Sequence, residues 1–186
     1  MSSNWLNVPN TITFARLVLA IVLFWLIWVD GFWITSAVVF VAAATTDWLD
    51  GYLARKYHQV TVLGRIMDPF VDKIIICGTF VFLLDSKQDS GINGWVVTIV
   101  LGREMFVSSL RGILEEQGRD FSASFAGKAK MALQCVAVTI CLLSMHPEIG
   151  TEQFVFWRNI AIWSAVGATV WSGMIYIVRG ARLLTG

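Results

Sequence analysis

The chain has 186 residues, of which 56% are hydrophobic and 15% are charged. This composition is too apolar for a water-soluble globular domain and favours a single membrane-embedded domain over residues 1–186. The formal net charge of +1 gives no electrostatic support for nucleic-acid binding.

Six apolar segments follow one another along the chain. They lie at residues 12–29, 34–54, 66–84, 95–114, 130–146 and 154–178. Each approaches the length of about 20 residues that a helix needs to cross the hydrocarbon core of a bilayer. Because a helix satisfies its own backbone hydrogen bonds inside lipid, the sequence predicts an all-α bundle of six transmembrane helices. Asn4–Asn10, which precede the first segment, are expected to form a short interfacial helix.

Basic residues gather at one set of segment ends. That side holds Arg16, Arg55, Lys56, Arg65, Lys73, Arg111, Arg119, Lys128, Lys130, Arg179 and Arg182. Arg103 lies in mid-segment, and only Lys87 and Arg158 lie on the other side. The opposite ends carry the tryptophans expected at a lipid interface, namely Trp28, Trp33, Trp95 and Trp157. Because cytoplasmic flanks collect positive charge, both termini are expected to be cytoplasmic.

Four aspartates lie in or beside the second and third segments. They are Asp47, Asp50, Asp68 and Asp72. Ionisable residues inside apolar segments are costly and usually functional. The first two are three residues apart and the last two are four apart, so each pair shares one helix face. If the faces meet, the repulsion among four carboxylates requires cations, and oxygen ligands select Mg²⁺, Mn²⁺ or Ca²⁺ over zinc.

Small residues accompany the aspartates. Gly51, Ala54 and Arg55 continue the helix face of Asp47 and Asp50, while Gly51 and Gly64 allow a bulky ligand to approach the backbone. Metal-bound carboxylates suit chemistry at a diphosphate, and a carboxylate near an acceptor hydroxyl can act as its base. We expect Pro69 to lie in the first turn of its helix.

Two other interpretations of the aspartates are open. They would form a membrane-surface salt-bridge cluster if they paired with nearby Arg and Lys residues, namely Arg55, Lys56, Arg65 and Lys73. Alternatively, they would line a cation or proton transport path. Transport does not explain the glycines or the arginine that shares the aspartates' helix face.

The chain resembles the CDP-alcohol phosphotransferase family. The signature D-x-x-D-G-x-x-A-R-x8-G-x-x-x-D-x-x-x-D is matched throughout by Asp47, Asp50, Gly51, Ala54, Arg55, Gly64, Asp68 and Asp72. The resemblance implies a six-helix membrane bundle with a cytoplasm-facing polar cavity, two Mg²⁺ or Mn²⁺ ions per site and a homodimer. It implies that the four aspartates hold the metals, that Asp72 is also the catalytic base, and that Gly51, Ala54, Arg55 and Gly64 surround CMP.

Four further stretches resemble the family members of bacterial inner membranes that use CDP-diacylglycerol and glycerol 3-phosphate. They are Asn7–Arg16, Asp68–Lys73, Gly102–Arg111 and Gly127–Lys130. This resemblance implies a phosphatidyl transfer to glycerol 3-phosphate with release of CMP. The alternative within the family is another alcohol acceptor, such as serine or inositol phosphate.

A phosphorylated acceptor requires cations. The candidates are Arg103, Arg111, Lys128 and Lys130. Arg103 and Arg111 are eight residues apart and therefore lie on roughly one helix face. Arginine suits bidentate phosphate recognition, whereas Lys128 and Lys130 have the alternative role of contacting anionic lipid. Glu104 is expected to pair with Arg103.

Overall fold

Each of the six apolar segments corresponds to one helix. The computed structural model describes the backbone of residues 8–57, 62–119 and 125–185, and the side chains of residues 11–46, 67–119 and 125–183. The helices are α1 (Val8–Val29), α2 (Trp33–Tyr57), α3 (Val62–Leu84), α4 (Gly94–Glu116), α5 (Phe125–Ser144) and α6 (Glu152–Thr185). All regular structure within the described ranges is helical, which confirms the all-α prediction. Of the expected interfacial helix, residues 8–10 begin α1 and residues 4–7 lie outside the described ranges.

Three of these helices are long and apolar enough to cross a membrane, judged over the described residues. The qualifying stretches are Thr11–Val29, Phe125–Ser144 and Glu152–Leu183, and Trp33–Thr46 of α2 is a shorter apolar stretch. The interfacial tryptophan expectation fits Trp28, Trp95 and Trp157, which are more than half exposed. It is wrong for Trp33, which is 1% exposed because it packs in the core between helices.

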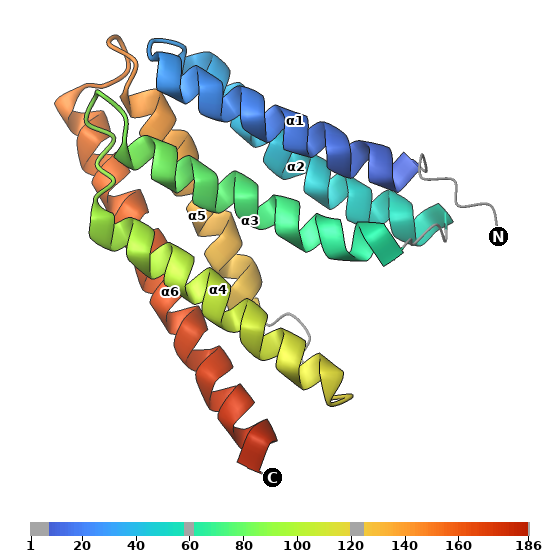
Figure 1. The fold of residues 1–186 in the computed structure, drawn as a ribbon. Helices are drawn as coiled ribbons and strands as arrows, with labels where there is room; N and C mark the ends of the chain where they lie inside the picture. The colour runs from blue at the N-terminus through green and yellow to red at the C-terminus, as the bar shows by residue number, and fades with distance from the viewer. Residues whose placement is uncertain (1–7, 58–61, 120–124, 186) are drawn as a thin grey trace.

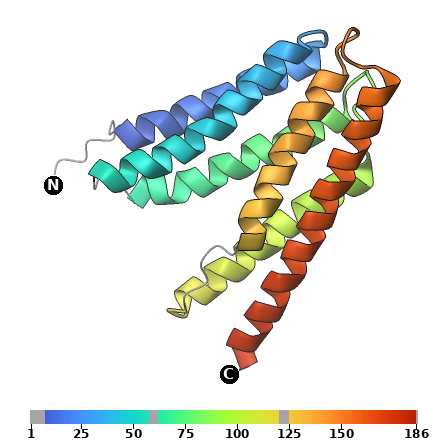
Figure 2. The same cartoon turned by 180° about the vertical axis from the view of Figure 1, so that it is seen from behind.

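The helices meet at one end of the molecule and diverge toward the other. Residues 30–32, 85–93 and 145–151 connect α1 to α2, α3 to α4 and α5 to α6 at the same end (Figure 1). From there, α1, α2 and α3 lean away from α4 and α6 (Figures 1 and 2). Helix α3 contacts α1, α2, α4 and α5, and α5 packs most extensively on α6. The described ends of α1 and α6 lie away from the connected end.

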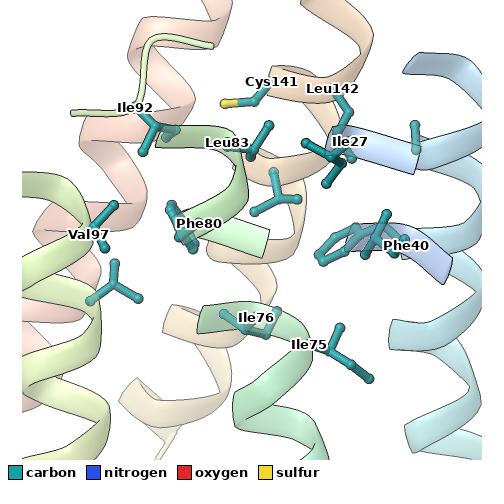
Figure 3. Packing of buried hydrophobic residues seen from close by; sticks show 14 of the residues in the cluster. Ile27, Phe40, Ile75, Ile76, Phe80, Leu83, Ile92, Val97, Cys141 and Leu142 are labelled. Atoms are coloured by element: carbon teal, nitrogen blue, oxygen red, sulfur yellow. The ribbon is translucent and has the colours of Figure 1, made fainter. Parts of the chain in front are cut away.

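The apolar core surrounds α3 near the connected end. Phe80 and Leu83 of α3 are 1% exposed and lie in one cluster with Ile27 of α1 and Phe40 of α2 (Figure 3). Helices α1 and α3 approach each other so closely at Gly78 that a Cβ atom there would lie 2.3 Å from the Phe24 ring. Full burial of such side chains stabilises a fold by about 1.5–3 kcal/mol each relative to exposure in water. The connected end therefore holds the main apolar core of the bundle.

Pro69 lies inside α3 and not in its first turn. The helix begins at Val62, seven residues earlier, so the expectation for this residue is wrong. Proline lacks the N–H that would bond the carbonyl four residues before it, and a backbone group inside a helix is thereby freed. The half of α3 that precedes the apolar core thus lacks one backbone hydrogen bond.

A buried arginine fixes the connection between α3 and α4. Arg158 of α6 is 3% exposed and donates from Nη1 to the carbonyl oxygen of Asp89 at 2.6 Å and from Nη2 to Asp89 Oδ2 at 2.9 Å. Gly91 has a φ of 75°, and a Cβ atom there would lie 2.8 Å from Arg158 Nε. Both observations favour glycine at this position. Arg158 therefore ties the α3–α4 connection to α6.

The Asp89–Arg158 pair predicts a pH-dependent contribution to stability. The hydrogen bonds from Arg158 and from the Gly91 N–H lower the pKa of the Asp89 carboxyl below its usual value. A pKa lowered by folding stabilises the protein above the unfolded value of about 3.9, and this stabilisation is lost as the pH falls through the folded pKa. We expect Asp89→Asn to lower the melting temperature in detergent at pH 7. The decrease should be only a few degrees, because Asp89 is 81% exposed and water screens its charge.

The difference between the variant and the parent protein should vanish at the acidic end of a pH series. Asp85→Asn, an exposed change in the same connection, serves as the control and should shift neither curve. A melting difference that is the same at every pH would contradict a role for the Asp89 charge.

Candidate active site

The backbone places the first part of the predicted metal and nucleotide site on two helices. Asp47, Asp50, Gly51, Ala54 and Arg55 all lie within α2, so their spacing does put them on one helix face. Gly64 lies in the first turn of α3. The side chains of these residues lie outside the described ranges. Their roles as metal and CMP ligands stay predictions.

The other two aspartates are held by α1. Thr13 Oγ1 donates to Asp68 Oδ1 at 2.5 Å, and Arg16 Nη2 donates to Asp72 Oδ1. Thr13 and Arg16 are 3% and 2% exposed, whereas Asp72 is 27% exposed. The two donors are three residues apart on α1 and the two acceptors are four apart on α3, so both helices present these groups on single faces. Helix α1 thus orients both carboxylates.

These α1 partners were not assigned from the sequence. Arg16 was counted only as a flanking positive charge, and Thr13 only as part of a resembling stretch. The available signal was the position of Arg16 inside an apolar segment, where a guanidinium requires a carboxylate partner. Choosing Asp72 among the acidic residues requires the packing of α1 on α3.

A cavity of about 510 Å³, lined by both apolar and charged side chains, lies between α3, α4 and α5. The lining residues are Pro69, Asp72, Lys73, Ile76, Arg103, Glu104, Val107, Ser108, Arg111, Gly112, Glu115, Lys130 and Met131. They come from the middle and first half of α3, the middle and second half of α4 and the first half of α5. The cavity therefore extends from the middle of the bundle toward its diverging end, and it includes Asp72 of the α3 aspartate pair.

Three of the four predicted acceptor ligands line this cavity. Arg103, Arg111 and Lys130 are among its lining residues. Lys128 is exposed and is not among the described lining residues. The two lysines separate because residues two apart on a helix point roughly 200° apart. The cavity also contains Lys73, which the sequence did not assign to the acceptor site.

The cavity cations are linked through one carboxylate. Glu104 Oε1 accepts hydrogen bonds from Arg103 Nη1 at 3.0 Å and from Lys130 Nζ. The predicted pairing of Glu104 with Arg103 is confirmed, and Lys130 is an additional partner. Arg103 also donates from Nη2 to Ser172 Oγ at 2.6 Å, and its guanidinium lies 5.3 Å from the centre of the Tyr176 ring. These contacts join α4 to α5 and α6.

Comparison with known proteins gives consistent similarities along nearly the whole chain. The sequence profile of the CDP-alcohol phosphatidyltransferase family matches residues 6–171. The CDP-diacylglycerol–glycerol-3-phosphate 3-phosphatidyltransferase of Bacillus subtilis (strain 168) is 35% identical, covering 96% of this chain and 97% of its own length. The protein of the same name from Pseudomonas fluorescens is 34% identical, covering 92% and 89%. A cardiolipin synthase (CMP-forming) of Oryza sativa subsp. japonica is 30% identical, covering 96% of this chain and 59% of its own length.

The Arg16–Asp72 pair predicts coupled effects on stability. Arg16→Met leaves Asp72 without this guanidinium, and breaking a largely buried ion pair costs about 3 kcal/mol. We expect the same replacement to cost much less in an Asp72→Asn background, because the amide carries no charge. Unfolding of the four proteins in detergent measures the coupling in a double-mutant cycle. Equal losses in both backgrounds would show that Arg16 contributes through packing alone.

Proposed function

The chain belongs to the CDP-alcohol phosphatidyltransferase family, and from this premise we propose that it transfers the phosphatidyl group of CDP-diacylglycerol to glycerol 3-phosphate. CMP is the other product. The B. subtilis and P. fluorescens relatives carry this activity in their names. Because a relative of comparable identity is named as a cardiolipin synthase, the choice of acceptor is argued from the cavity.

The observation that supports this acceptor is the cavity that contains both Asp72 and several cations. Lys73, Arg103, Arg111 and Lys130 bring four cationic side chains to a space of about 510 Å³, which also contains the carboxylates of Asp72, Glu104 and Glu115. A phosphate dianion is stabilised by such charges through charge-assisted hydrogen bonds. An uncharged acceptor such as glycerol, or a zwitterion such as serine, does not require this set. The cavity therefore favours a small phosphorylated alcohol.

Asp72 is proposed as the base of the reaction. A hydroxyl oxygen of glycerol 3-phosphate attacks the phosphorus on the diacylglycerol side of the donor, so one P–O bond forms while the bond to the CMP oxygen breaks. The hydroxyl proton passes to the Asp72 carboxylate, which lines the cavity. Arg16 donates a hydrogen bond to Asp72 and so fixes the orientation of this carboxylate. No covalent enzyme intermediate is required.

Two divalent metal ions are proposed to be held by Asp47, Asp50, Asp68 and Asp72. The carboxylate oxygens of Asp68 and Asp72 suit Mg²⁺ or Mn²⁺, and both lie on one face of α3. When bound, the metals neutralise charge on the diphosphate and on the departing CMP. Gly51, Ala54, Arg55 and Gly64 are proposed to surround the CMP portion, on the basis of the family signature.

The protein is membrane-bound, and we propose that all six helices span the bacterial inner membrane. The distribution of basic residues supports a cytoplasmic location for the cavity and both termini. Polar residues of α3 and α4 then face the cavity instead of lipid, as intramembrane charges generally do. Homodimer formation is proposed from the family resemblance alone.

The direct test measures CMP release by the purified protein with CDP-diacylglycerol, Mg²⁺ and one acceptor at a time. We expect turnover with glycerol 3-phosphate and none with glycerol or serine. Asp72→Asn should lower turnover at least about a thousandfold, because the amide cannot accept the proton. The amide oxygen can still accept a hydrogen bond from Arg16, but the lost ion pair should lower stability by about 3 kcal/mol, so the folded state of the variant is measured together with its turnover. Asp85→Asn is the control, and substantial activity of Asp72→Asn would exclude this residue as the base.

Arg111 supplies a test of the acceptor site that is independent of the base. Arg111→Ala removes a charged hydrogen-bond donor, which is worth about 1.5–3 kcal/mol. The KM for glycerol 3-phosphate should therefore rise about 10- to 100-fold, while the KM for CDP-diacylglycerol changes little. The exposed Arg182→Ala serves as the control for loss of an arginine. An unchanged KM for the acceptor would remove Arg111 from the acceptor site.

A further inference from the structure

Glu104 is an unexpected residue in a cavity for an anion. Its carboxylate lines the cavity and would repel a phosphate dianion. Its Oε1 atom nevertheless bridges Arg103 and Lys130, which come from α4 and α5. The three side chains are only 13%, 10% and 7% exposed in the order Glu104, Arg103, Lys130. Little water is present to compensate these charges, so they compensate one another.

Arg103 is held on its other side by α6. Its Nη2 atom donates to Ser172 at 2.6 Å, and the Tyr176 ring lies against its guanidinium. Both terminal nitrogens of Arg103 therefore have protein acceptors. Lys130 directs its ammonium group to Glu104. These two cations are committed to contacts within the protein.

The other two cavity cations differ. Lys73 of α3 and Arg111 of α4 form no ion pair with any residue that the structure describes. Arg111 Nε is buried and has no hydrogen-bond partner within that part of the chain. A buried donor without a partner costs about 1–3 kcal/mol, and a ligand that accepts a bond from it recovers this energy. Arg111 lies eight residues from Arg103, about 12 Å further along α4.

We infer that Glu104 is a positioning residue of the acceptor cavity, which neutralises Arg103 and Lys130 and so leaves Lys73 and Arg111 to hold the phosphate of the acceptor. The inference rests on the proposed function for the identity of the acceptor. Lys73 is thereby added to the acceptor site, and Lys130 supports the cavity wall. Lys73 follows the proposed base directly in α3, so this arrangement places the phosphate beside the α3 wall, where the acceptor hydroxyl must be.

Loss of the Glu104 charge should misplace the acceptor without weakening its binding. Arg103, which lies about two helical turns from Arg111, and Lys130 would then be uncompensated cations and would attract the phosphate themselves. An acceptor bound there is held away from its reactive position. Non-productive binding lowers kcat and KM together, whereas a general disturbance of the fold does not lower KM.

The first experiment compares two lysines of the same cavity. Binding of glycerol 3-phosphate, and of inorganic phosphate as the simpler probe, is measured by titration calorimetry on the detergent-purified protein without CDP-diacylglycerol. Lys73→Met should raise Kd about tenfold or more, and Lys130→Met should raise it less than about threefold. The opposite order, or equal effects of both variants, would overturn the inference.

The second experiment follows turnover of Glu104 variants. Glu104→Gln should lower kcat about tenfold without raising the KM for glycerol 3-phosphate, and Glu104→Asp should retain most of the activity. The double variant Glu104→Gln with Lys130→Met should recover kcat, because the uncompensated charge is removed with its partner. Glu116→Gln, an exposed change on the same helix, is the control. A raised KM in Glu104→Gln, or a double variant no more active than Glu104→Gln, would refute the positioning role.

The two experiments separate this inference from the proposed function. If no acceptor releases CMP, the proposed function fails, and the calorimetry still decides which lysine contacts phosphate. If Glu104→Gln does not fold because two buried cations are left unpaired, the inference is tested by turnover of the double variant and by phosphate binding to the two lysine variants.

Discussion

A guanidinium buried in an apolar helix must find a carboxylate, and this requirement organises the structure around α1 and α3. Arg16 is 2% exposed, so water does not solvate its charge, and it bonds Asp72 instead. One turn earlier on both helices, Thr13 bonds Asp68. The two contacts fix the register of α1 on α3, and the close approach at Gly78 continues the same packing. Asp72, the proposed base, is thus also the group that compensates a buried arginine.

The molecule divides its apolar and polar interactions between its two ends. Apolar packing around Phe80 and Leu83 is concentrated near the connected end, where Arg158 also holds the α3–α4 connection. The cavity extends toward the diverging end, where ion pairs such as Lys130–Glu104 join helices beside a smaller apolar cluster of α4 and α6. Many of the polar groups that are expensive in lipid therefore line one cavity.

Much of the helical framework and part of the site follow from sequence, because the signals are local. Segment length and hydropathy locate all six helices, and a spacing of four places Asp68 and Asp72 on one face. The pairing of Arg103 with Glu104 was expected from their adjacency. The different environments of Lys128 and Lys130 follow from helix geometry, although the two lysines were grouped together. The position of Pro69 was missed because the start of α3 lacks a clear boundary signal in the sequence.

Other parts of the site depend on contacts between distant helices. The bond from Lys130 to Glu104 joins residues 26 apart, and the bond from Arg103 to Ser172 joins residues 69 apart. No periodicity within one segment specifies such partners, so the division of cations within the cavity became visible only in three dimensions. The convergence of Asp47 and Asp50 with the α3 aspartates is still a prediction, since their side chains lie outside the described ranges.

The placement of the cavity walls on separate, diverging helices gives a bound acceptor a mechanical role. Lys73 belongs to α3 and Arg111 to α4, and both line one space away from the main apolar core. In the proposed arrangement, a dianion that contacts both side chains would bridge α3 and α4 beside Asp72. Binding of the acceptor would then stiffen these two walls, and its conversion into a lipid-linked product would remove the bridge.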